Sequence, residues 1–159
     1  MAGNQEEVLA VRQQFTDWLS KKQWSFREED APSAYVFRFE LHGEDIPINL
    51  VVVFEKDRAQ FSVLSSLPGT IPEEKRGEAY ALLNLINDAS DFGKITMNTE
   101  NGSLRFRYCA YYDQCLLSDA FFKHVIYNCA TFIDDFNDRL LMFSKGMVSA
   151  EDSMRGLLY

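Results

Sequence analysis

Apolar residues recur every three or four positions in three stretches of the chain, which is the spacing of a helix with one buried face. The first stretch covers residues 4–22, the second follows Pro72, and the third runs from Ser118 to Lys145. The Ser118 hydroxyl can accept a hydrogen bond from a free amide of the first turn, so it is the predicted N-cap of the third helix. We expect each helix to pack one face against a core.

The start of the second helix has its own signal. Thr70 and Glu73 fit a capping box, and Pro72 is tolerated in a first turn because its missing amide is not needed there. We therefore expect this helix to begin soon after a strand that ends at Leu67.

A period of two indicates strands. Residues 35–41 and 60–67 alternate in this way, while residues 48–54 are almost continuously apolar, which predicts a central strand covered on both faces. Residues 94–98 and 103–111 are predicted to form a hairpin across an Asn-Gly turn. Short turns join the first three strands, so we expect them to form an antiparallel meander.

The predicted element order is α-β-β-β-α-β-β-α, which defines an α+β fold with an antiparallel sheet of about five strands. Residues 1–146 contain all these elements without a linker, so they are expected to form a single domain. Residues 147–159 make a C-terminal tail that either adds a short helix from Ser149 or stays loose.

The second helix is apolar on more than one side. Leu82, Leu83 and Ile86 share one stripe, and Tyr80 and Leu85 lie off it. A helix of this kind usually contacts something besides its own core. These five residues are therefore the candidate surface for a protein partner or for a homodimer.

Charge restricts the classes of partner. Among 159 residues, 16 Lys and Arg stand against 24 Asp and Glu, giving a net charge of −8. An acidic chain repels phosphate backbones and anionic lipid, so we expect neither nucleic acid nor membrane as a partner. Cys109, Cys115 and Cys129 are odd in number and could close only short loops. We expect a reducing, cytoplasmic location.

Few residues are candidates for catalysis or for binding a metal or cofactor. The segment with Cys109, Cys115, His124 and Cys129 begins with a C-x5-C spacing, which does not match the usual zinc knuckle. Cys115 or Ser118 with His124 is the one candidate nucleophile–base group, and Ser118 is already assigned to a helix cap. No glycine-rich phosphate motif occurs. We expect no catalytic residue, no metal and no cofactor.

Acidic residues cluster in the third helix. Asp134, Asp135 and Asp138 fall on its polar side. Paired carboxylates that act as acid and base must converge in a cleft with their pKa values pushed apart. A solvated helix face is the expected role of these three residues.

Basic residues gather on the predicted sheet. The candidate basic face consists of Arg38, Lys94, Arg105 and Arg107. RNA-recognition sheets present aromatic residues beside their basic ones, whereas alternation here places the aromatic neighbours of the two hairpin arginines on the opposite side. The remaining hypothesis for these four residues is a basic face that binds an acidic segment of a partner.

With these residues in hand, the chain resembles the YbjN family, whose fold is similar to that of the small type III secretion chaperones. Three segments carry the resemblance: residues 65–76 (SSLPGTIPEEKR), residues 82–87 (LLNLIN) with 93–95 (GKI), and residues 101–108 (NGSLRFRY) with Leu117-Ser118. The resemblance implies a cytosolic dimer that works by binding other proteins. The family has no established catalytic residues, so the resemblance assigns none to this chain.

Three functions are consistent with this sequence. The first is a non-enzymatic chaperone-like or adaptor protein that binds another protein through apolar sheet or helix surface. The second is a dimeric regulator of sensory transduction or stress with one defined partner. The third, a small ligand-binding domain or enzyme, rests on Cys115 and His124 alone.

Overall fold

The computed structural model describes residues 2–112 and 117–155. Within them, six strands form one antiparallel sheet in the order β1-β2-β3-β4-β6-β5. The strands are β1 (Phe26–Asp30), β2 (Ala34–Leu41), β3 (Ile48–Glu55), β4 (Gln60–Thr70), β5 (Lys94–Met97) and β6 (Ser103–Tyr111). The helices are α1 (Ala2–Lys21), the 3-10 turn η1 (Glu73–Lys75), α2 (Arg76–Asp88), α3 (Asp119–Ser144) and α4 (Ala150–Met154).

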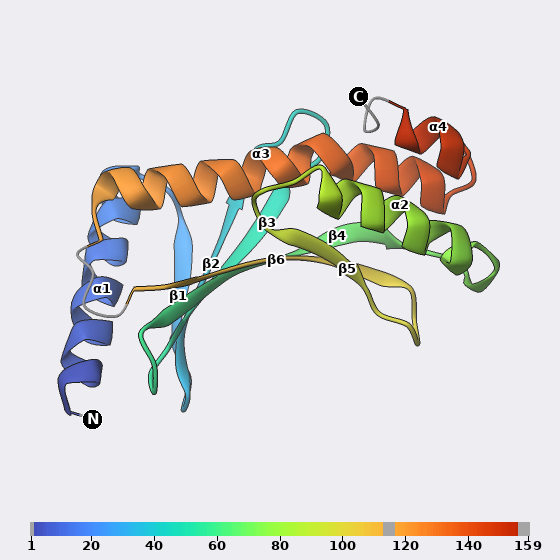
Figure 1. The fold of residues 1–159 in the computed structure, drawn as a ribbon. Coiled ribbons are helices and arrows are strands. Elements are labelled where there is room, and N and C mark those ends of the chain that lie inside the picture. The colour runs from blue at the N-terminus through green and yellow to red at the C-terminus, as the bar shows by residue number, and fades with distance from the viewer. Residues whose placement is uncertain (1, 113–116, 156–159) are drawn as a thin grey trace.

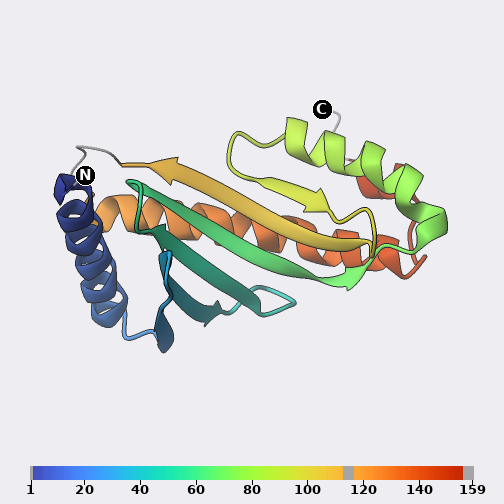
Figure 2. The same ribbon diagram turned by 90° about the horizontal axis from the view of Figure 1, so that it is seen from below.

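The helices lie on one side of the sheet or beside its edges (Figure 1). The long helix α3 crosses the sheet, α1 stands at the end nearest β1, and α2 lies with α4 at the other end. Seen from below, the strands lie in front of α3, and no described helix covers that side (Figure 2). The predicted α+β class with an antiparallel sheet is confirmed.

The core fills the space between α1, α3 and one face of the sheet. Its centre is Phe15 of α1, whose ring lies 5.1 Å from Phe37, 5.3 Å from Phe54 and 5.2 Å from Phe122, measured between centroids. These aromatic side chains come from α1, β2, β3 and α3, so burying them fixes the two helices on this face. The predicted N-cap of α3 is confirmed, since the amide of Phe121 donates to the Ser118 hydroxyl at 3.1 Å.

One strand was missed by the sequence pattern. Strand β1, with the sequence FREED, pairs with β2 at the sheet edge. Only Phe26 is apolar, and the other four side chains are exposed. Alternation cannot reveal a strand held by backbone pairing alone, and a charged edge also resists aggregation with other chains. The sheet therefore has six strands instead of five.

The predicted capping box is wrong. Strand β4 continues through Pro68 to Thr70, which pairs with Ser103 across an irregular register. The Ile71 amide then donates to the Gly102 carbonyl at 2.9 Å. Thr70, which the pattern assigned to the start of the helix, is therefore part of the sheet and pairs with the β5–β6 hairpin. The N-cap of the following turn is Pro72, which makes no side-chain hydrogen bond.

The prediction that β3 is covered on both faces is also wrong. Leu50, Val52 and Phe54 are buried beneath the helices, whereas Val51 and Val53 are only half-buried. The helices cover one face, and nothing among the described residues covers the other.

The C-terminal tail folds back onto the domain. The Ser149 hydroxyl accepts a hydrogen bond from the Asp152 amide at 3.0 Å and starts α4. The Arg139 guanidinium of α3 donates to the Ser153 carbonyl at 2.8 Å. Helix α4 contacts both α2 and α3, so it adds a cover to α2 that local patterning did not reveal.

Candidate functional site

A single row of residues crosses all six strands. In the printed register, Arg27 pairs with Arg38, and the row continues through Val51 and Leu64 to Arg107 and Lys94. Paired residues on neighbouring strands point to the same side of a sheet. We call this side, turned away from the helices, the open face.

The open face brings the predicted basic residues together. Arg38, Lys94 and Arg107 lie in the row itself, and Arg105 lies two residues further along β6, where it pairs with Thr96. Sequence reasoning missed Arg27, because its strand has no apolar alternation. All five cations are exposed, and none forms an ion pair with a described residue.

Between the cations lies an apolar patch on the middle strands. We call it the central patch, and it consists of Val36, Val51, Val53 and Leu64. All four side chains are half-buried, although no described helix covers them. An apolar strip flanked by cations can contact both aliphatic and acidic groups of a ligand.

Carboxylates on the open face are fewer. Register and alternation place Glu29, Glu40 and Glu55 there, and Arg58 already pairs with Glu55 at 3.2 Å. The open face therefore carries more positive than negative side chains, although the chain as a whole is strongly acidic. The excess of acidic over basic residues therefore lies on the other surfaces of the molecule.

The open face is hollowed at its β1–β3 end. A groove of about 530 Å³ there is lined by Arg27, Arg38 and Val51, together with neighbouring residues of the three strands. The groove therefore lies at one end of the row.

The α2 surface is not available as predicted. Leu82, Leu83 and Ile86 are core residues, with at most 5% of each exposed. Leu85 is half-buried, and Tyr80 alone is well exposed, at 48%. The three buried leucine and isoleucine side chains face the chain's own core, and α4 and β5 pack against α2.

The cysteine and histidine candidates do not converge among the described residues. Cys129 is buried in α3, and burial raises the pKa of its thiol. Cys109 is exposed on the open face, where its sulfur accepts a hydrogen bond from the Gln60 amide at 2.8 Å. His124 contacts Asn128 on the same helix, and Cys115 lies outside the described residues.

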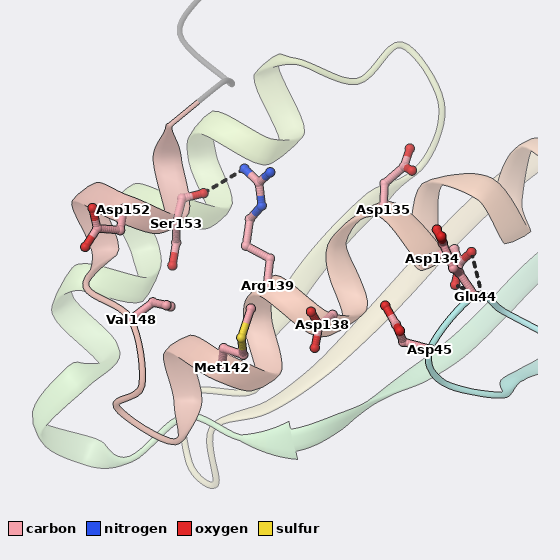
Figure 3. Close-up of a pocket in the computed structure, with 10 residues that line it drawn as sticks. All are labelled: Glu44, Asp45, Asp134, Asp135, Asp138, Arg139, Met142, Val148, Asp152 and Ser153. Carbon is pink, nitrogen blue, oxygen red and sulfur yellow. Dashed lines mark hydrogen bonds between the residues drawn. The ribbon is translucent and has the colours of Figure 1, made fainter.

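An acidic pocket of about 410 Å³ lies on the helical side (Figure 3). Its carboxylates come from the β2–β3 loop, α3 and α4: Glu44, Asp45, Asp134, Asp135, Asp138 and Asp152. Asp134 is bound to the loop backbone, because the Glu44 amide donates to its carboxylate. Across the described parts of the chain, no three Asp, Glu, His or Cys side chains are grouped so that they could hold a metal ion.

A third hollow, of about 610 Å³, lies between α3 and the start of β1. Trp24 and Tyr127 form its aromatic wall, with ring centroids 6.0 Å apart, and Lys22 lies 5.7 Å from the Tyr127 ring.

The open face is therefore a broad sheet surface with an apolar centre and cationic flanks. The family model that matches the chain covers residues 12–142 and is described as "YbjN: Putative bacterial sensory transduction regulator". The chain belongs to the YbjN family. The family's description names a regulator and not a catalytic activity.

Two solved structures share the fold. One is "YbjN, a putative transcription regulator from E. coli", with a TM-score of 0.52 and 15% identity, covering 80% of this chain and 91% of that one. The other is an uncharacterized protein from Methanothermobacter thermautotrophicus, with a TM-score of 0.53 and 14% identity, covering 76% and 90%. The comparison with curated proteins found no match.

No helix in the described ranges has the length and apolar character needed to span a membrane.

Proposed function

We propose that this protein is a non-enzymatic adaptor-type regulator that acts in the cytoplasm by binding another protein on the open face. One observation carries the proposal. Strand β3 has the apolar run of a strand buried on both sides, yet the helices bury only one side. A partner that packs on Val51 and Val53 would supply the missing layer.

The family's description as a sensory transduction regulator supports this proposal, since regulators act through partners. The position of the cations supports it as well. Arg38 and Arg107 stand on either side of the central patch without an intramolecular carboxylate partner among the described residues, so both can pair with a second molecule. Rim charges of this kind steer association and fix orientation.

A crosslinking experiment tests the proposal. A photo-reactive amino acid is placed at Val53 on the open face in one variant and at Lys123, exposed on α3, in a matched control. After irradiation in the protein's own cells, we expect a defined protein adduct from position 53 and not from position 123. Equal adducts from both positions, or none from position 53, would contradict the proposal.

The homodimer stays a prediction, and its surface needs a new location because most of the α2 candidates are buried. Light scattering at tens of micromolar protein measures the mass directly. If irradiation of the Val53 variant yields an adduct of twice the chain mass, a second copy occupies the open face. That result would replace the adaptor proposal with a dimer interface.

A further inference from the structure

Building on the proposed function, we propose that the open face binds an extended, acidic segment of its partner with the pattern acid-x-aliphatic-x-acid. The segment crosses the strands along the row from Arg38 to Arg107. Its two carboxylates pair with these arginines, and its aliphatic residue packs on Val51 and Leu64.

The spacing follows from the sheet itself. Arg38 of β2 and Arg107 of β6 are separated by three strand steps, through Val51 of β3 and Leu64 of β4. Neighbouring strands lie about 4.8 Å apart, so the two arginines stand roughly 14 Å apart across the sheet. An extended chain rises about 3.3 Å per residue, so about four residues span this distance.

Alternation decides which residues of the segment face the sheet. In an extended chain, positions i, i+2 and i+4 lie on one side. If acids occupy positions i and i+4 over the arginines, position i+2 falls above the boundary between Val51 and Leu64. An aliphatic side chain at that position is buried against two half-buried aliphatic ones.

The charges beside the row favour an extended segment over a helix. Glu40 lies two residues after Arg38, on one side of the row. Glu29 lies on the other side, where it pairs with Val36, two residues before Arg38. A helix, about 10 Å across, would cover these neighbouring rows and bring its acidic residues toward both carboxylates. A single extended strand stays over the row, where the charged residues are all cations.

The outer cations extend the site at both ends. Arg27 pairs with Arg38 on the edge strand β1, and Lys94 pairs with Arg107 on the opposite edge strand β5. Additional acidic residues outside the five-residue pattern would therefore add affinity. An acidic residue at the central position i+2 would not, because Val51 and Leu64 offer it no hydrogen-bond donor.

Fluorescence anisotropy with the full chain tests the pattern. The probe is a labelled peptide, Gly-Ser-Glu-Ser-Leu-Ser-Glu-Ser-Gly, and its control has the same composition with the two glutamates adjacent. We expect the spaced peptide to bind at least severalfold more tightly. The variant Arg38→Ala/Arg107→Ala should weaken this binding about tenfold. The matched variant Lys123→Ala/Lys145→Ala, which removes the same charge from the helical side, should leave binding unchanged.

The possible results separate this inference from the proposed function. Equal binding of the two peptides, or an equal loss in both double variants, would overturn the pattern. Tighter binding of a single-stranded oligonucleotide than of the spaced peptide would overturn it too, and would assign the row to nucleic acid. If position 53 still crosslinks a partner while the spaced peptide fails to bind, the pattern is wrong and the adaptor proposal stands.

Discussion

The backbone amide of Glu44 donates one bifurcated hydrogen bond to the two carboxylate oxygens of Asp134, at 3.0 and 3.1 Å. This contact joins the β2–β3 loop to the middle of α3. Because β2 and β3 carry Arg38 and Val51, the loop helps to fix the strands that form one half of the open face. A carboxylate expected on a solvated surface is thus a structural link.

We predict that Asp134→Asn destabilises the fold by about 1 kcal/mol, because the charge-assisted hydrogen bond becomes weaker. The matched variant Asp135→Asn changes an exposed neighbour that forms no hydrogen bond with another described residue, and it should alter stability by less than about 0.5 kcal/mol. Urea denaturation measures both variants, and amide exchange at Glu44 reports the loop directly. Equal effects of the two substitutions would show that the contact contributes nothing.

Two glycines should respond in opposite ways to alanine. A Cβ on Gly43 would meet the Asp134 carboxylate and the Ile46 carbonyl, so Gly43→Ala should destabilise by about 1–3 kcal/mol. Gly77, in α2, has nothing within 4 Å of such a Cβ, so Gly77→Ala should stabilise by up to about 1 kcal/mol. The midpoints of thermal unfolding distinguish these signs. A higher midpoint for Gly43→Ala would contradict the close packing of the loop at Gly43, and a lower midpoint for Gly77→Ala would contradict the open space around Gly77.

Tyr112 should limit stability at high pH. Its ring is buried, its hydroxyl has no hydrogen-bond partner among the described residues, and burial raises its pKa above the ordinary value of 10.0. Above pH 10 the unfolded chain releases this proton while the folded chain retains it, so the tyrosine's contribution to stability is lost as pH rises.

The variant Tyr112→Phe removes both the unpartnered hydroxyl and the titration. We expect it to be more stable than the parent by about 1 kcal/mol at pH 7 and to lose less stability between about pH 10 and pH 11. Tyr111→Phe, on an exposed neighbour, is the control and should behave like the parent. Parallel pH profiles for parent and Tyr112→Phe would refute the prediction.

The two described cysteines should differ in reactivity. In a Cys115→Ser background, iodoacetamide at pH 8 should label Cys109, which is exposed, within minutes. Cys129 should be labelled only after denaturation, because burial blocks access and raises its thiol pKa, which keeps the reactive thiolate scarce. Peptide mass spectrometry gives the label at each site. Comparable labelling of both cysteines in the folded protein would contradict the burial of Cys129.

Local patterning predicted the elements whose side chains alternate. The apolar stripe and Ser118 cap of α3 predicted that helix, and the Asn-Gly turn predicted the β5–β6 hairpin. Strand β1 could not be predicted in this way, because FREED is held by backbone hydrogen bonds to β2 and its side chains carry no period. Arg27 was missed with it.

Three features follow from the local amino-acid pattern: the α+β class, the parity that places Arg105 and Arg107 on one side of β6, and the helix stripes. Each depends on residues close in the chain. Which apolar surface stays uncovered depends instead on how the elements pack together. Folding places α4 against α2 and buries Leu82, whereas it leaves Val51 half-buried in the row between Arg38 and Arg107. Coverage of a surface depends on segments distant in sequence, and no local period encodes that packing.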